Sequence, residues 1–519
     1  MTNLKVGISG KNLKGWSILL EQIGILFSII DNTADISNYT VIIINDDFNG
    51  LRIEDVKAYL KKGGAVLCSG KFFDKLSAQK SKKVYAKYLF EDDGSIFTGI
   101  GLVDIYSKIY LPKDANTLIT DNDEFAIFVG EYCGGHIVIL PFDAGELILN
   151  SKTVAKSFYS TQKRLPFENV SSISKGKVRR LVSASLEHLF HKREMPFIHK
   201  WCFPNNQPTI FTWRIDTDSA SENEVKSLLD LIDSNGMKAS WFVDVKSQEK
   251  HFYLYRQMVE HEIGLHGYEH KSYNDYEKNL LNIQRALEVF ELNNLKAKSF
   301  TAPFGKWSYE IAKALGKYDF EYSSEFSYDY DNLPSRPFVE NGDGLLQIPI
   351  HPICIGSLRR QGFNENSMIE YFENVIEEKY QNREPVFLYH HPKDNNERVV
   401  KYIFDKIKRL NLLNLRMIDF AKWWKRRSQV NLQVSIDGEK LHIIPHGQFP
   451  DCWLHISDST GNEAFSPINS VVDLSNLNWV KRTIVSTTPS DLKRIRKYNP
   501  WVVINRIEDN VQRIFRKIP

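Results

Sequence analysis

Cysteine is scarce in this chain and shows no paired pattern. Five cysteines occur among 519 residues. They are widely scattered, at Cys68, Cys133, Cys202, Cys354 and Cys452. No Cys-x-x-Cys motif is present. An odd, dispersed set of this kind argues against a disulfide framework and fits a reducing compartment.

Long apolar runs and a strong net charge are also missing. The longest apolar stretch, Trp16 to Ile30, is broken by Glu21 and Gln22, so we expect no membrane-spanning segment. The first residues, MTNLKVGISG, lack the apolar core of a secretory signal. A net charge of +3 is too small to predict nucleic-acid binding. These absences predict a cytoplasmic protein without a nucleic-acid partner, and they leave its oligomeric state open.

The length and the composition indicate several folded domains. A chain of 519 residues exceeds one ordinary hydrophobic core, so two to four domains are expected. Apolar residues make up 42% and charged residues 25%, as is typical of globular proteins. There is no low-complexity segment and no internal repeat.

Residues 1–150 alternate strand-like and helix-like segments, which predicts a doubly wound α/β domain. Gly63-Gly64 ends one helix, and Cys133-Gly134 joins two strands as a hairpin turn. The pattern is similar to the glutamine-amidotransferase-like fold. That family needs a nucleophilic cysteine, and Cys68 is the only candidate, without a recognisable histidine partner. We therefore expect Cys68 to be a core residue and the domain to be a non-catalytic accessory module.

Residues 151–208 are predicted to connect this domain to the next. Apolar residues at helical spacing over 177–194 predict a helix, and Lys200 to Pro208 reads as an extended linker. His188, His191 and His199 are expected to carry no chemistry.

Residues 209–427 repeat a strand followed by a helix about seven or eight times, which predicts a closed or nearly closed (β/α) barrel. Two of its strand-like runs end abruptly in polar motifs, TWRIDTD (212–218) and GLHGYEH (264–270). Sites in α/β folds are built at the carboxyl ends of strands. One aspartate with two histidines is a common ligand set for zinc, and a second aspartate beside them can act as a general base.

The region 200–427 resembles the polysaccharide deacetylase domain (NodB homology, carbohydrate esterase family 4). The resemblance rests on the two motifs above, on TAPFG (301–305), which is similar to the family's Arg-x-Pro-x-Gly, and on FLYHHP (387–392). It implies a distorted (β/α) barrel. It also implies a metal-dependent hydrolase that removes an acetyl or similar acyl group from an N- or O-acylated sugar or glycan precursor.

The resemblance assigns a role to each motif. It makes Asp216 the base and makes Asp218, His266 and His270 the ligands of one divalent metal ion, with zinc as first choice and cobalt or nickel as alternatives. His391 or His390 would be the general acid; we favour His391, because it precedes a proline. A backbone N–H near Phe304 or Gly305, in the loop that holds Thr301 and Pro303, would bind the oxyanion.

Two departures from the family pattern stand out. Thr301 replaces the arginine that orients the catalytic aspartate in the family. Arg214 lies on the same strand face as Asp216 and is a candidate replacement. The acidic motif that follows in the family is also indistinct here, with Glu325 or Asp329 as candidates, and His351 could line the cleft. These departures keep open a second hypothesis, a catalytically degenerate barrel that binds glycans or scaffolds a partner.

The remaining residues are predicted to form two small units. Alternating residues over 428–485 predict an antiparallel β-module, which we expect to cap the barrel rather than to bind carbohydrate. Residues 486–519 predict a basic amphipathic helix with one apolar stripe. Such a stripe is expected to dock on the protein itself; contact with an anionic membrane surface is the alternative.

Overall fold

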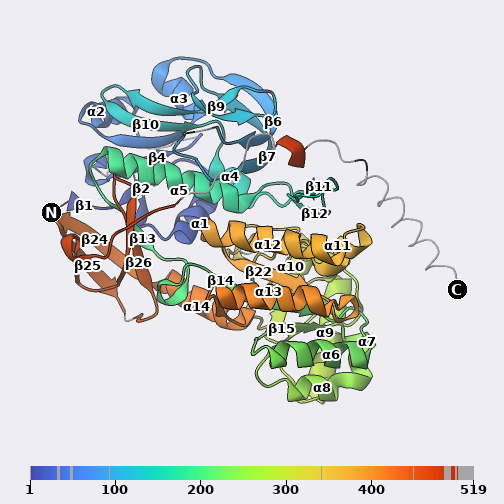
Figure 1. The fold of residues 1–519 in the computed structure, drawn as a ribbon. Helices are drawn as coiled ribbons and strands as arrows, with labels where there is room; N and C mark the ends of the chain where they lie inside the picture. Colours follow the sequence, from blue (N-terminus) through green and yellow to red (C-terminus); the bar gives the residue numbers. More distant parts are fainter. Residues whose placement is uncertain are drawn as a thin grey trace.

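The computed structural model describes residues 2–31, 35–46, 51–92, 94–339, 342–447, 449–483, 493–496 and 500. A mixed nine-stranded sheet, a curled parallel sheet and two small antiparallel sheets make up its main parts (Figure 1). None of the described helices is both long enough and apolar enough to cross a bilayer. Most of the predicted helical tail over 486–519 lies outside the described residues.

The nine-stranded sheet has a parallel half and an antiparallel half. The parallel half contains β3 (Phe27–Ile29), β2 (Val6–Ser9), β4 (Val41–Ile44), β5 (Ala65–Ser69) and β10 (Gly135–Leu140). The antiparallel half continues through β9 (Phe125–Tyr132), β8 (Thr117–Thr120), β6 (Lys82–Phe90) and β7 (Leu102–Leu111). The antiparallel half departs from the predicted doubly wound pattern, because turns and loops rather than helices connect its strands.

Helices cover both faces of the parallel half. One core contains α1 (Leu13–Ile23) and α4 (Ala144–Leu149), and the other contains α2 (Ile53–Lys61) and α3 (Gly70–Ser77). Cys68 is buried at the end of β5 and belongs to the second of these cores. Burial raises the pKa of its thiol, so the thiol stays protonated and unreactive at neutral pH.

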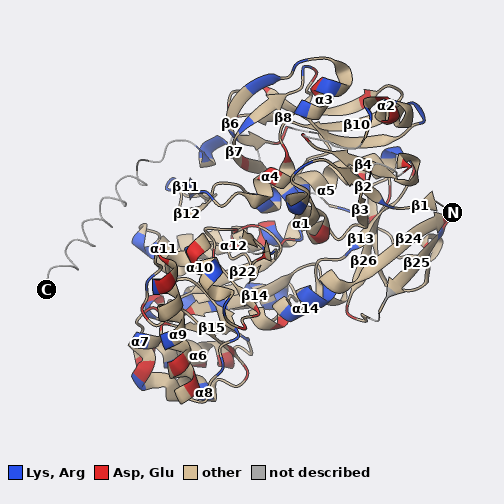
Figure 2. Cartoon of the chain, turned by 180° about the vertical axis from the view of Figure 1, so that it is seen from behind, with Lys and Arg blue, Asp and Glu red and all other residues tan. Residues whose placement is uncertain are grey.

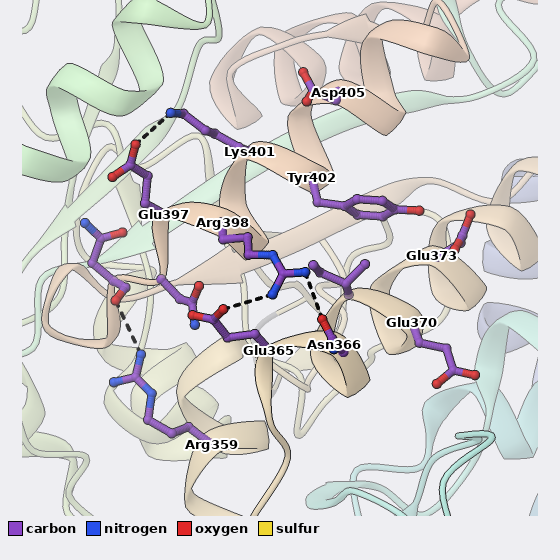
Figure 3. Close-up of a pocket in the computed structure, with 13 residues that line it drawn as sticks. Arg359, Glu365, Asn366, Glu370, Glu373, Glu397, Arg398, Lys401, Tyr402 and Asp405 are labelled. Carbon is purple, nitrogen blue, oxygen red and sulfur yellow. Dashed lines mark hydrogen bonds and ion pairs between the residues drawn. The ribbon is translucent and has the colours of Figure 1, made fainter.

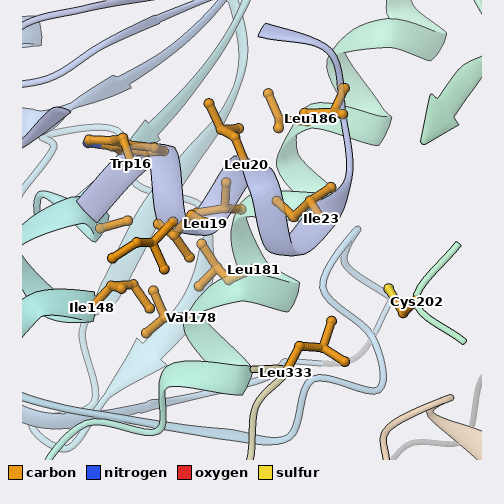
Figure 4. Packing of buried hydrophobic residues seen from close by; sticks show 14 of the residues in the cluster. Trp16, Leu19, Leu20, Ile23, Ile148, Val178, Leu181, Leu186, Cys202 and Leu333 are labelled. Atoms are coloured by element: carbon orange, nitrogen blue, oxygen red, sulfur yellow. The ribbon is translucent and has the colours of Figure 1, made fainter. Parts of the chain in front are cut away.

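The predicted connector is part of the first core. Its helix, α5 (Lys175–Lys192), packs against α1, α4 and the nine-stranded sheet, and Figure 4 shows the interdigitated side chains. Val178, Leu181 and Leu186 are fully buried. The apolar stripe that the helical spacing predicts is therefore confirmed. It packs against the N-terminal sheet, so α5 is not part of a free linker. Residues 151–174 add a two-stranded hairpin of β11 (Thr153–Ser157) and β12 (Phe167–Ser171).

The C-terminal β-module is completed by strands from elsewhere in the chain. One sheet joins β1 (Thr2–Asn3) to β24 (Asn431–Asp437), β25 (Lys440–His446) and β28 (Val471–Asp473). The other joins β13 (Phe197–Lys200) to β26 (Trp453–Ser457), β27 (Asn462–Pro467) and β29 (Val480–Lys481). Lys200, where we predicted an extended linker to begin, is the last residue of β13 and pairs with β26.

The central region is a curled parallel sheet. Its hydrogen-bonded order is β21 (Leu346–Gln347), β18 (Tyr322–Ser323), β17 (Ser299–Phe300), β16 (Glu262–Leu265), β15 (Ser240–Val243), β14 (Ile210–Asp216) and β22 (Val386–His390), with β23 (Leu413–Asn414) also paired to β14. Among the described residues β21 and β22 do not pair, so the sheet is an open half-barrel and not the closed barrel that the strand count allowed.

Helices cover the outside of this half-barrel. They are α6 (Glu222–Ser234), α7 (Val245–Gln248), α8 (Phe252–Gln257), α9 (Tyr276–Leu292), α10 (Tyr309–Leu315), α11 (Ile355–Arg360), α12 (Glu365–Gln381), α13 (Glu397–Arg409) and α14 (Met417–Gln429). The residues buried between α6 to α13 and the sheet form a core of their own, whereas the buried residues of α14 belong to the core that continues into the N-terminal sheet. Basic and acidic residues are interspersed along the outer helices (Figure 2), consistent with the small net charge.

One buried arginine ties three distant segments together. Arg427, near the end of α14, is fully buried. Its Nε donates to the Trp201 carbonyl (2.6 Å), its Nη2 to the Lys200 carbonyl (2.9 Å) and its Nη1 to the Glu21 carbonyl (3.1 Å). The side chain therefore links the half-barrel to α1 and to the segment after β13.

We expect Arg427→Met to lower the free energy of unfolding by about 3 kcal/mol, because several buried carbonyls lose a charged donor. Urea-induced unfolding measures the change. Arg426→Met is the matched control: Arg426 is half-exposed and pairs with Asp451 at the surface (2.9 Å), so its loss should cost less than about 1 kcal/mol. Equal effects of the two substitutions would contradict the role of Arg427.

Candidate active site

The candidate residues meet at the carboxyl edge of the half-barrel. β14 ends at Asp216, β16 ends one residue before His266, and β22 ends one residue before His391. Because the strands are parallel, their carboxyl ends lie along one edge. Strand geometry alone thus delivers these polar side chains, which are far apart in sequence, to one place.

Arg214 and Asp216 form a buried, bidentate ion pair. Arg214 Nε donates to Asp216 Oδ1 (2.8 Å) and Nη2 to Oδ2 (2.6 Å). The remaining nitrogen, Nη1, donates to the Ser324 carbonyl (2.7 Å), which holds the guanidinium in place. The side chains of strand residues two apart share a face, so these two contact each other directly. Arg214 thus places a cation directly beside Asp216.

This pairing keeps Asp216 ionised. Burial acts to raise the pKa of Asp216, but attraction from Arg214 and His266 and the hydrogen bonds from Arg214 outweigh it, so the pKa lies below its usual value. At neutral pH Asp216 is therefore a carboxylate that can accept a proton.

Asp218, His266 and His270 form a compact cluster beside Asp216. Asp218 Oδ1 lies 2.9 Å from His270 Nε2 and 3.2 Å from His266 Nε2. One ligand atom from each of the three residues lies within 4.8 Å of the other two. Asp218 has a φ of 37° and Ser219 a φ of 59°, in the left-handed region, so the chain turns sharply where Asp218 meets the histidines.

Thr301 orients His266. The Thr301 carbonyl oxygen and hydroxyl each lie 2.8 Å from His266 Nδ1. A carbonyl oxygen can only accept, so Nδ1 carries the hydrogen and the lone pair lies on Nε2, which faces Asp218. The residue at the family's arginine position therefore has a different task here.

The three side chains fit a divalent metal ion. Asp218 Oδ1 and His270 Nε2 are both buried and lack a hydrogen-bond partner of good geometry. Burying such atoms is costly unless something else satisfies them. One carboxylate oxygen and two imidazole nitrogens match the ligand preference of zinc and of similar ions, and a three-residue set leaves coordination positions open for water and substrate.

Of the two adjacent histidines, His391 lies at the cluster. Its Nε2 is 3.5 Å from Asp218 Oδ2. Burial acts to lower the pKa of His391, but the attraction of Asp218 and Cys354 outweighs it and raises the pKa to about 9. His390 points to the other face, where its ring lies 5.7 Å from that of Trp213, and burial holds its pKa well below the usual value. This difference follows from the alternation of side chains along a strand.

Three neighbours of this cluster were missed by sequence reasoning. Asp394 Oδ2 lies 3.6 Å and Cys354 Sγ 3.7 Å from His391 Nδ1. Lys393 Nζ lies 3.7 Å from Asp218 Oδ2 and donates to the Asp218 carbonyl. Lys393 and Asp394 directly follow the His-Pro motif, which was an available signal. Nothing in the sequence around Cys354 indicated its position.

The loop 301–305 lines the mouth of the site. Phe304 has a φ of 63°, its side chain is 63% exposed, and its ring lies 4.8 Å from that of His270. Gly305 N–H donates to the Ala302 carbonyl (3.0 Å), so it is already engaged. Pro303 has no N–H and accepts a hydrogen bond from Ser272. Within the described chain the Phe304 N–H has no partner, which makes it the better of the two predicted oxyanion donors.

Of the remaining candidates for site residues, Glu325 lies at the site, whereas Asp329 and His351 lie elsewhere. Glu325 accepts a hydrogen bond from Ala302 N–H (3.0 Å) and lies close enough to Arg214 to affect its pKa, so it supports the site. Asp329 lies instead by Lys175 and Asp331, where burial and Asp331 raise its pKa to about 7. His351 hydrogen-bonds the Tyr371 hydroxyl (2.9 Å) in a different cavity. Of the two candidates for the acidic motif Glu325 therefore lies at the site and Asp329 does not, and the expectation that His351 lines the cleft is wrong.

A groove of about 1090 Å³ runs between α12 and α13, outside the half-barrel (Figure 3). Its side chains pair with one another: Arg398 with Glu365 (3.2 Å) and Asn366 (2.8 Å), and Lys401 with Glu397 (2.7 Å). Such mutual pairing is typical of a hydrated surface groove, and it makes Arg398 a suitable position for control substitutions.

Comparison with known families agrees with this geometry. Residues 209–323 match the polysaccharide deacetylase family model. This stretch contains Asp216, Asp218, His266 and His270, and it ends before the strand that delivers His391. The match supports a hydrolase of the deacetylase type. A search of curated proteins finds no match to the chain.

The solved structures to which this chain is similar include the following three. A polysaccharide-deacetylase-like protein from Mycobacterium smegmatis is 17% identical, with a TM-score of 0.37, and the alignment covers 44% of this chain and 94% of that one. The allantoinase Puue is also 17% identical, with a TM-score of 0.37 and coverage of 43% and 92%. A family 4 carbohydrate esterase from Streptomyces lividans, in complex with acetate, is 13% identical, with a TM-score of 0.28 and coverage of 40% and 92%. The similarity to the amidotransferase-like fold stays a prediction.

We expect the purified protein to hold about one equivalent of zinc, cobalt or nickel per chain, because the donor set suits these ions. Asp218→Ala and His266→Ala should each abolish it, as measured by elemental analysis after dialysis. His251→Ala is the control, since this partly exposed histidine faces Glu222 away from the cluster and should leave the metal content unchanged. Full metal content in both ligand variants would refute the assignment.

Proposed function

We propose that the protein is a metal-dependent hydrolase that removes an acetyl or similar acyl group from an N- or O-acylated sugar or glycan precursor. The observation that carries this proposal is the cluster of Asp218, His266 and His270 beside an aspartate held ionised by Arg214. The family match to residues 209–323 supports the same reaction class.

Asp216 is the general base of the proposed reaction. A divalent ion at Asp218, His266 and His270 would polarise the acyl oxygen and lower the pKa of water. Asp216, held by Arg214, accepts the proton of the attacking water and stays in one orientation while it does so. The two hydrogen bonds from Arg214 occupy in-plane positions of the carboxylate, so its remaining lone pairs serve the water.

His391 is the general acid. With a pKa raised to about 9 it carries a proton at neutral pH, ready for the departing amine or alcohol. Asp394 and Cys354, on the Nδ1 side of the ring, keep Nε2 directed at the cluster. His390 takes no part, because its ring is buried on the opposite face.

Phe304 is proposed to have two tasks at the mouth of the site. Its unpaired N–H is a donor for the oxyanion that forms when water adds to the acyl carbon. Its exposed ring, next to His270, offers an apolar surface against which a sugar ring can pack. The left-handed φ of Phe304 keeps both groups in place, at a cost of about 1 kcal/mol or more.

The alternative of a degenerate barrel rested in part on Thr301 in place of arginine. We propose that Arg214, which makes a bidentate contact with Asp216, takes over the orienting role of this arginine. Thr301 holds His266 instead. With both tasks filled, the arrangement supports turnover more than passive binding.

We expect Arg214→Met to lower kcat/KM for acetate release from acetylated amino sugars by about 100-fold or more. Without the guanidinium, burial dominates and raises the pKa of Asp216, so the base becomes protonated near neutral pH. Asp216→Asn should lose at least as much activity. Metal content should stay unchanged in both variants, because neither residue belongs to the ligand cluster.

Arg398→Met serves as the matched control, because this arginine lies in the outer groove of Figure 3 and should leave kcat/KM unchanged. Full activity in both Arg214→Met and Asp216→Asn would refute the proposed base. Loss of metal together with activity would point to collapse of the site rather than to loss of the base.

The rate is expected to fall as pH rises, because a general acid must be protonated to act. A metal ion bound to Asp218 would weaken the attraction of this carboxylate for the His391 proton and so lower the pKa of His391. The fall of kcat at high pH should therefore have its midpoint at or below about 9, the pKa of His391 without metal. His391→Gln should lower kcat by about 100-fold or more and should remove this limb from the pH profile. His390→Leu should keep the limb, and the reverse pattern would show that the wrong histidine was assigned.

A further inference from the structure

A second pocket lies where the three main parts of the molecule meet. It encloses about 470 Å³ between α5, β13, β26, β27 and the turn Asn382–Glu384 that leads from α12 into β22. We refer to it as the junction pocket. The N-terminal sheet domain, the half-barrel and the β-module each contribute part of its wall, so it exists only in the assembled fold.

The junction pocket is separate from the candidate active site. Arg383, in its wall, comes three residues before β22 begins, whereas His391 comes one residue after β22 ends. A five-residue strand spans about 17 Å. The two sites therefore lie at opposite ends of the same strand, and no residue of the proposed mechanism lines this pocket.

Two arginines of the pocket wall have donors without acceptors. Arg180 uses Nη2 to donate to the Gly99 carbonyl (2.7 Å) and to Asn382 Oδ1 (2.9 Å), and Arg383 uses Nη2 to donate to Glu463. In both residues the other terminal nitrogen, Nη1, is buried and lacks a hydrogen-bond partner. A buried guanidinium nitrogen without an acceptor is costly, and a bound anion within reach of a small side-chain movement would satisfy it.

The acidic residues of the wall are already paired. Glu384 accepts two hydrogen bonds from Arg179 Nη2 (2.8 and 2.9 Å). Glu187 accepts from the Ser457 hydroxyl (2.6 Å) and pairs with Arg482 (3.1 Å). Five basic residues and four carboxylates line the pocket, and among the basic residues Arg180 and Arg383 each have a nitrogen without an acceptor. The local charge balance therefore favours an anion over a cation.

A histidine pair braces Arg383. His199 and His455 are 3.0 Å apart, and His455 Nε2 lies 3.0 Å from Glu463, the partner of Arg383. Burial lowers the pKa of both histidines and keeps their charge low, so they do not replace the arginines as cations. The Arg383 guanidinium also lies over the Trp201 ring, 5.6 Å from its centre. These contacts keep the Arg383 guanidinium close to the pocket before any ligand arrives, so that a small movement is enough to reach an anion.

The backbone at Arg383 ends helix α12. Its φ of 54° is the left-handed conformation with which many helices end, and Arg383 N–H donates to the Tyr380 carbonyl (3.1 Å) and Glu384 N–H to the Lys379 carbonyl (2.8 Å). This helix ending brings three consecutive residues, Asn382, Arg383 and Glu384, into the pocket wall.

We propose that the junction pocket binds a small organic phosphate, with Arg180 and Arg383 donating to the phosphate oxygens. A tetrahedral phosphate can accept from two guanidinium groups that approach from different walls, whereas a planar carboxylate is suited to one fork. The volume of about 470 Å³ exceeds a bare phosphate and admits a ring-bearing molecule. The phosphate can belong to a sugar or to a nucleotide, since both carry a ring.

Isothermal titration calorimetry with the full-length, metal-loaded protein tests this proposal. The probes are inorganic phosphate, glucose 6-phosphate, AMP and unphosphorylated glucose. We expect saturable binding of at least one phosphate monoester, tighter than that of inorganic phosphate, and no binding of glucose. The tighter of the two esters identifies the source of the phosphate. Absence of saturable binding by all three phosphate probes would overturn the proposal.

Arg180→Gln and Arg383→Gln should each weaken this binding by about tenfold or more, because each removes a charge-assisted hydrogen bond. Arg398→Gln, in the groove of Figure 3, should leave it unchanged. Should Arg383→Gln fail to fold, Arg180→Gln carries the test, because Arg180 is the other proposed donor to the phosphate. Unchanged affinity in Arg180→Gln would also overturn the proposal.

Discussion

The buried pair of Arg214 and Asp216 is the interaction on which the candidate active site depends. A carboxylate at this depth would be neutral without a cation beside it, and a neutral aspartate can neither act as a base nor attract the neighbouring histidines. Asp216 in turn stabilises Arg214, because its negative charge compensates the charge of the buried guanidinium. The two residues lie two apart on one strand, so the sheet itself fixes their contact.

The site illustrates how a chemical requirement can be met from a different position in the chain. The polysaccharide deacetylase pattern places an arginine at the start of the third motif, where this chain has Thr301. Arg214 contacts Asp216 with two hydrogen bonds from the first strand, and we propose that it fills this role. Thr301, relieved of that task, accepts a hydrogen bond from His266 and thereby directs its Nε2 towards Asp218. The geometry around the aspartate is what the chemistry requires, and more than one residue can satisfy it.

The accessory parts are closely joined to the half-barrel. β1 and β13, from the first 200 residues, complete the sheets of the C-terminal β-module, and Arg427 binds α14 to α1. The junction pocket lies among these parts, at the end of β22 opposite to the candidate active site. Ligand binding there would strengthen the contacts between the three parts, because each contributes to the pocket wall.

Local patterns in the sequence determined the strand-ending motifs, the parallel strands that deliver them and the apolar stripe of α5, because each depends on residues close together in the chain. The choice between Glu325 and Asp329, and the position of Cys354 beside His391, were decided only by tertiary structure, since both depend on where distant segments pack. Tertiary structure alone also decided that the half-barrel is open at one edge and that β1 and β13 pair with strands of the β-module. Strand pairing between segments more than 200 residues apart leaves no periodic signal in either one, so folding alone brings them together.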